Sequence, residues 1–143
     1  MDKTELGIIV VLIFIAMLFD IRKKKIPLYM IFFIGIISVA MTIYNMIFGN
    51  ERIEEVAAGL FPGITLFIVS FLTKEGIGYG DCFIILFAGM ILGIEKMIMI
   101  LMTAFVLSSI LSVFLFVLKK VNRKSTLPFV PFLFLGMGVT IFV

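Results

Sequence analysis

The stretch that decides the fold is residues 97–118, MIMILMTAFVLSSILSVFLFVL, which runs for 22 residues without a charge. A helix needs about 20 such residues to cross the hydrocarbon core of a bilayer. The rest of the chain has a similar character, because 63% of its 143 residues are hydrophobic and its mean hydropathy is +1.31. This composition excludes a water-soluble fold. We therefore expect an all-α, polytopic integral membrane protein.

Charges and helix breakers divide the sequence into six predicted transmembrane helices. They cover residues 5–21, 26–48, 56–73, 82–94, 97–118 and 127–143. Gly59, Pro62 and Gly63 interrupt the third helix, where a kink is tolerated if neighbouring groups satisfy the backbone. The fourth is short for a full crossing and needs upstream residues, local bilayer thinning or partial burial to cross. We predict a single six-helix domain over residues 1–143.

The basic residues predict the orientation of these helices. Nine of the twelve lie after the first, third and fifth helices: Arg22, Lys23, Lys24, Lys25, Lys74, Lys119, Lys120, Arg123 and Lys124. Positive loops stay in the cytoplasm, so both termini are expected on the extracytoplasmic side. The same loops are expected to contact anionic lipid. No aromatic residues interleave with them, so nucleic-acid binding is not indicated.

Two residue types limit the chemistry. The chain contains no histidine and a single cysteine, Cys82. An internal disulfide, a multi-cysteine zinc cluster, a histidine-based triad and most zinc-hydrolase ligand sets are therefore excluded. We expect no metal and no cofactor. Cys82 has no histidine to activate it, so a small buried neighbour of Asp81 is the simpler interpretation.

Asp20 and Asp81 are the candidate catalytic residues. A carboxylate at mid-membrane costs about 2.5–3.5 kcal/mol on insertion scales, and these two lie at the cytoplasmic ends of their predicted helices. Asp20 can instead be an interfacial residue paired with Arg22 or a nearby lysine, and Asp81 can be a helix N-cap. Gly78 and Gly80, which precede Asp81, favour a functional interpretation, because glycine permits positive φ and lets an extended backbone approach the carboxylate.

The segment Gly78-Tyr79-Gly80-Asp81 resembles the G-x-G-D signature of type IV prepilin peptidases and, more remotely, of presenilin-type intramembrane proteases. Three further segments are similar to prepilin peptidase motifs in the same order: Asp20-Ile21-Arg22 followed by Ile26-Pro27, the stretch after Asp81 that ends in Gly89-Met90-Ile91-Leu92-Gly93, and Leu127-Pro128-Phe129-Val130-Pro131-Phe132 with Gly136 beyond. The resemblance spans residues 20–136. Leu28 and Phe83 depart from it, since many members carry Asn and Lys at these positions.

This resemblance implies an aspartyl endopeptidase in the cytoplasmic membrane of a prokaryote. Its substrates would be type IV pilin-like precursors, whose short basic leader is removed at the cytoplasmic face. Asp20 and Asp81 would be catalytic, and Gly78, Tyr79, Gly80, Pro27, Pro128 and Pro131 would contact the substrate. The chain resembles the minimal form that lacks the N-methyltransferase region.

An aspartyl pair needs one carboxylate to take a proton from water and the other to polarise the scissile carbonyl. The helix dipole favours negative charge at a helix N-terminus and disfavours it at a C-terminus. We therefore expect Asp81 to act as the base and Asp20 as the acid.

Three alternatives stay open. Ser70 and Lys74 are four residues apart and can form a serine–lysine pair, although helix packing and a lipid-facing anchor explain them more simply. A proton-coupled transporter can use the two aspartates as a relay. A non-catalytic assembly factor can dock partner helices on the Gly59-x-x-x-Gly63 and Gly89-x-x-x-Gly93 pairs, although these glycines fit packing within the bundle better.

Overall fold

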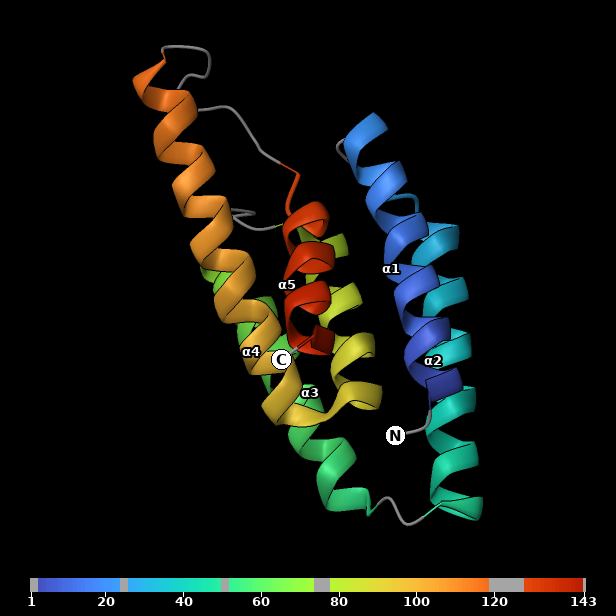
Figure 1. Ribbon diagram of the computed structural model, residues 1–143. Helices are drawn as coiled ribbons and strands as arrows, with labels where there is room; N and C mark the ends of the chain where they lie inside the picture. The colour runs from blue at the N-terminus through green and yellow to red at the C-terminus, as the bar shows by residue number, and fades with distance from the viewer. Residues whose placement is uncertain (1–2, 24–25, 50–51, 74–77, 119–127, 143) are drawn as a thin grey trace.

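The computed structural model of the chain describes residues 3–23, 26–49, 52–73, 78–118 and 128–142. Within these residues the protein is all-α. Its five helices are α1 (Lys3–Lys23), α2 (Leu28–Phe48), α3 (Ile53–Leu72), α4 (Tyr79–Val117) and α5 (Val130–Phe142). Successive helical segments alternate in direction along the bundle (Figure 1). The predicted helices thus agree with the observed ones in type and, within a few residues, in position.

The main difference lies in α4, a 39-residue element that joins the predicted helices 82–94 and 97–118. Gly93 interrupts it with φ 78° and ψ 167°, a conformation that essentially only glycine adopts. The chain reverses direction at this point, so the two parts of α4 run antiparallel (Figure 1). The first part begins at Tyr79, and these upstream residues lengthen the helix that was predicted to be short.

Three helices, α2, α3 and α4, are long and apolar enough to cross a membrane, and α5 is a shorter apolar helix. Their outward faces carry large hydrophobic side chains such as Phe33, Ile47 and Val113, which are 59%, 67% and 63% exposed. Such surfaces suit lipid and not water. The protein is therefore embedded in a membrane.

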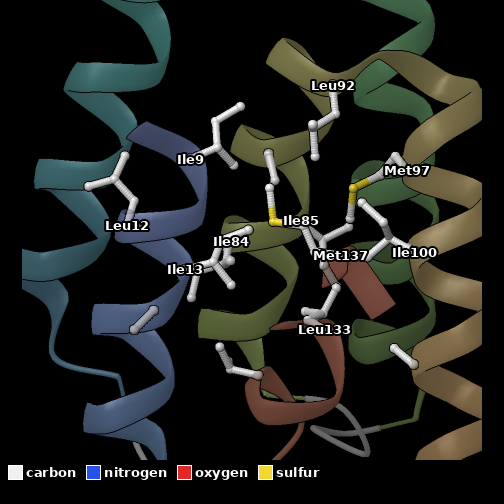
Figure 2. Packing of buried hydrophobic residues seen from close by; sticks show 14 of the residues in the cluster. Ile9, Leu12, Ile13, Ile84, Ile85, Leu92, Met97, Ile100, Leu133 and Met137 are labelled. Atoms are coloured by element: carbon white, nitrogen blue, oxygen red, sulfur yellow. The ribbon is translucent and has the colours of Figure 1, made fainter. Parts of the chain in front are cut away.

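The first part of α4 forms the centre of the bundle and contacts α2, α3 and α5. Ile84 and Ile85 are buried there, and Figure 2 shows them between Ile13 of α1 and Met137 of α5. Leu133 completes the contact from α5. Beyond Ala104, the second part of α4 is mostly exposed. The N-terminal turn of α4, which holds Asp81, is therefore attached to the best-packed segment of the protein.

Glycines bring α3 and α4 into close contact. A methyl group on Gly59 or Gly89 would overlap the carbonyl oxygen of the other residue, and one on Gly63 would lie 2.5 Å from Leu86 Cα. α3 is helical through Pro62. The small-residue pairs therefore pack within the bundle, as in many membrane proteins, and Gly59 and Gly63 are not available to dock a partner helix.

The two ends of the bundle can be told apart by the residues that lie there. Leu6 near the start of α1, Leu92 and Lys96 beside the α4 reversal, and Thr140 near the end of α5 line one small cavity. The last turn of α1 and the first turns of α4 and α5 lie toward the opposite end (Figure 1). The candidate catalytic residues are therefore at the end of the bundle opposite to this cavity.

Candidate active site

Asp20 lies in the last turn of α1 and is 5% exposed. The backbone N–H of Val130, at the start of α5, donates a hydrogen bond of 3.1 Å to Asp20 Oδ2. The backbone of Phe129 also interacts with this carboxylate. Arg22, the partner considered from the sequence, is exposed. Asp20 is thus a buried acceptor for a neighbouring helix.

Asp81 lies in the first turn of α4 and is partly buried. The predicted N-cap role is wrong, because the helix begins earlier: Gly78 is the N-cap residue, and no side chain caps this end. The Asp81 N–H instead donates a 3.1 Å hydrogen bond to the Gly78 carbonyl oxygen. The carboxylate therefore remains available for a role other than capping, at a helix end where negative charge is favoured.

The two aspartates are close enough for their charges to interact. They come from segments about sixty residues apart in the sequence, and the bundle brings them to one end. Asp20 closes α1, Asp81 opens α4, and the start of α5 contacts Asp20 directly. This arrangement gives a pair of carboxylates in a poorly solvated setting, which is the chemical requirement for acid–base cooperation.

The two glycines of the motif do not have the predicted conformation. Gly78 has φ −61°, and Gly80 lies within α4. Among the described glycines, Gly93 is the one with positive φ. Space is restricted at Gly80, where a methyl group would lie 3.3 Å from Ile26 Cβ, whereas a methyl group on Gly78 would make an ordinary contact of 3.4 Å with Asp81 Oδ2.

Other residues predicted to contact substrate surround this end of the bundle. Pro27 is the N-cap residue of α2 and has extended geometry, and the adjacent Ile26 packs on Gly80. Pro131 lies in the first turn of α5, with Pro128 just before it. The Tyr79 ring lies 5.6 Å from the Phe67 ring, centroid to centroid. Pro27, Tyr79, Pro128 and Pro131 therefore lie toward the same end of the bundle as the aspartates, and their contact with substrate stays a prediction.

The competing nucleophiles are enclosed. Ser70 and Cys82 are 0% and 1% exposed, and their side chains interact between α3 and α4. Cys82 is thus the small buried residue that the sequence indicated. Lys74, the other member of the serine–lysine pair, lies outside the described residues, as does Leu127 of the last motif. Ser70 as found is buried by protein and cannot meet a substrate.

Sequence reasoning missed the contact between Val130 and Asp20. Pro128 and Pro131 are the available signal, because prolines mark the start of a helix, where backbone N–H groups lack helical partners. A buried carboxylate is a suitable acceptor for such a group. The identity of that carboxylate depends on tertiary packing.

Comparison with protein families gives one match. A model of the type IV leader peptidase family matches residues 7–117, a range that includes Asp20 and Asp81 and ends before α5. Comparisons with curated proteins and with solved structures gave no match. The matched range covers most of the chain and agrees with the motif resemblance. The chain therefore belongs to the type IV leader peptidase family.

Proposed function

We propose that the protein is an aspartyl endopeptidase in which Asp20 and Asp81 are the catalytic pair. The observation that carries this proposal is the meeting of two shielded, electrostatically interacting carboxylates at one end of the bundle. Family membership makes the protein a protease. Without histidine anywhere in the chain, and with Ser70 and Cys82 buried, two carboxylates are the natural means of activating water.

The proposed reaction uses one ionised and one protonated aspartate. The ionised carboxylate takes a proton from a water molecule, whose oxygen attacks the scissile carbonyl carbon. The protonated carboxyl donates a hydrogen bond to the carbonyl oxygen. The other aspartate then passes the proton that it took from water to the leaving nitrogen as the C–N bond breaks. We assign the base to Asp81. Asp20 Oδ2 already accepts the Val130 N–H, so in this scheme Oδ1 carries the catalytic proton.

Two helix ends act on the charge of Asp20. Asp20 ends α1 but also lies against the start of α5, and the two helix ends act on its charge in opposite directions. The assignment therefore depends on the first-turn location of Asp81 in α4, where one helix end acts in favour of the ionised form.

We further propose that the substrates are type IV pilin-like precursors, cleaved at the cytoplasmic face of a prokaryotic cell membrane. Six crossings, with the two parts of α4 counted separately and both termini outside, would put nine of the twelve basic residues in the cytoplasm. A precursor would place its hydrophobic helix alongside the bundle and its short leader at the aspartates. The proposed substrate contacts at this end are Gly78, Tyr79, Gly80, Pro27, Pro128 and Pro131.

The test is leader removal from a pilin-like precursor co-expressed with the protein. Asp20→Asn and Asp81→Asn should each lower the cleavage rate by roughly 10²–10⁴-fold, the usual contribution of a general acid or base. Glu54→Gln, in the exposed first turn of α3, is the matched control and should cleave normally.

Cleavage at the normal rate by either aspartate variant would overturn the catalytic assignment. Proton flux in liposomes, lost in both aspartate variants and without any cleavage by the wild-type protein, would favour the transporter instead.

A further inference from the structure

The start of α5 contacts the candidate catalytic centre through the backbone of Val130 and Phe129, and the Val130 hydrogen bond is the better defined of the two. The N–H of Val130 donates to Asp20 Oδ2 at 3.1 Å across a sequence separation of 110 residues. Both partners are buried, Asp20 at 5% and Val130 at 0% exposure. Asp20 lies within the family match, which ends at residue 117, whereas Val130 lies beyond it.

The local sequence leaves this N–H free for Asp20. The N–H groups of Phe132 and Leu133 both donate to the Phe129 carbonyl oxygen, at 3.0 and 3.2 Å. Pro131 has no N–H at all. Val130 is the first residue of α5, so no earlier helical carbonyl can accept a hydrogen bond from its N–H.

The turn that carries this donor is firmly anchored. Leu133 and Met137 of α5 are each 1% exposed and belong to the central core with Ile84 and Ile85. The close-up in Figure 2 shows Leu133 and Met137 directed toward this core. Because α1 also packs on α5, the N–H and the carboxylate are held from both sides.

We propose that the first turn of α5 positions Asp20 for catalysis, with the Val130 N–H as the positioning group. The N–H holds Oδ2 and fixes the rotation of the carboxylate, so that Oδ1 is left to act together with Asp81. This proposal rests on the catalytic role of Asp20 proposed above. In this proposal α5 contributes to the active site by positioning Asp20, in addition to its role as a membrane helix.

A purely structural cap is the competing interpretation, in which Asp20 only stabilises the start of α5. The two interpretations predict different effects when the hydrogen bond between Val130 and Asp20 is lost. Loss of a cap lowers the stability of the fold and leaves the turnover of the folded protein intact. Loss of a positioning bond lowers kcat at unchanged KM, because the substrate still binds while the carboxylate is misaligned.

The decisive experiment replaces Val130 by its α-hydroxy acid, which substitutes an ester oxygen for the N–H and keeps the side chain. The matched control is the same replacement at Leu133, which removes a hydrogen bond within the same turn but none to Asp20. Steady-state cleavage of a purified pilin-like precursor gives kcat and KM, and thermal unfolding in detergent gives the stability of each variant.

We expect the ester at Val130 to lower kcat by roughly ten- to a hundredfold with KM changed by less than about threefold, and the ester at Leu133 to lower stability with kcat retained. Normal kcat in the folded Val130 ester, or an equal loss of kcat in the Leu133 ester, would overturn the proposal. If Asp20→Asn is itself fully active, the proposed function fails first, so the two failures are distinguishable.

A second route covers an ester variant that does not fold. Val130→Pro also removes the N–H, and proline suits the first residue of a helix. In addition, amide hydrogen exchange over residues 128–133 can be compared between the wild type and the Asp20→Ala variant, in which Val130 itself is not substituted. Faster exchange at Val130 in Asp20→Ala supports the contact, and unchanged exchange contradicts it.

Discussion

Gly80 shows how a single hydrogen atom in place of a side chain sets the geometry beside Asp81. A methyl group there would press on Ile26, 3.3 Å from both Cβ and Cδ1. Overpacking of this kind commonly costs about 1–3 kcal/mol, and here the strain would move the first turn of α4. We expect Gly80→Ala to lower kcat/KM for precursor cleavage by roughly tenfold.

Ile26→Ala removes the Cδ1 contact, so the double variant should recover part of the lost activity. Gly138→Ala is the control, because nothing lies within 4 Å of the added methyl. Full activity in Gly80→Ala would show that the first turn of α4 tolerates this displacement.

Ser70 and Cys82 provide the corresponding test of the alternative nucleophiles. Both are buried between α3 and α4, where their side chains interact. Ser70→Ala and Cys82→Ala should each retain cleavage and lose about 1 kcal/mol of stability, the typical net contribution of a neutral hydrogen bond. Activity assays and thermal unfolding measure the two effects separately. Complete loss of cleavage in a folded Ser70→Ala protein would favour serine chemistry.

At the scale of the element, α4 owes its shape to Gly93. The residue has φ 78° and ψ 167°, and a side chain in this region costs of order 1–3 kcal/mol. Space is not the obstacle, because nothing lies within 4 Å of an added methyl. We expect Gly93→Ala to lower the free energy of unfolding by about that amount, measured by thermal or denaturant unfolding in detergent.

Gly7→Ala is the matched control for Gly93→Ala. Gly7 also has open space around it and lies within α1. There alanine has the higher helix propensity, so this variant should be neutral or slightly stabilising. Equal stability of the two alanine variants would mean that the reversal in α4 does not depend on the backbone freedom of Gly93.

At the scale of the whole molecule, the proposed orientation predicts which ends of the helices face the cytoplasm. Arg52 just before α3 and Leu118 just after α4 are both exposed. The start of α3 and the end of α4 lie toward opposite ends of the bundle (Figure 1). The native Cys82 is 1% exposed and should give little background with a thiol reagent.

A membrane-impermeant maleimide should therefore label Arg52→Cys on intact cells and Leu118→Cys only after the membrane is opened. The physical basis is the retention of positive loops in the cytoplasm. Labelling in the reverse order would move the aspartates to the outer face of the membrane and exclude cleavage of leaders in the cytoplasm.

The sequence by itself determined the membrane class, the all-α fold and most helix boundaries. These depend on local properties, namely the length of apolar runs against the thickness of a bilayer. It also indicated Asp20 and Asp81 as a pair, because charges in alternate loops place the ends of distant helices on one side of the membrane. The type IV leader peptidase family was recognisable from motifs in their order along the chain.

Only the tertiary structure decided how these parts meet. The sequence could not show that Val130 donates to Asp20, that Gly80 packs on Ile26, or that Ser70 is enclosed beside Cys82. Nor could it show that Gly80 serves close packing, or that Gly78 and Gly80 do not have positive φ. Contacts of this kind join residues far apart in the chain, and they depend on which helix faces pack together. The length of apolar runs and the positions of charges do not determine which faces pack together. The close fit of side chains in the core determines it.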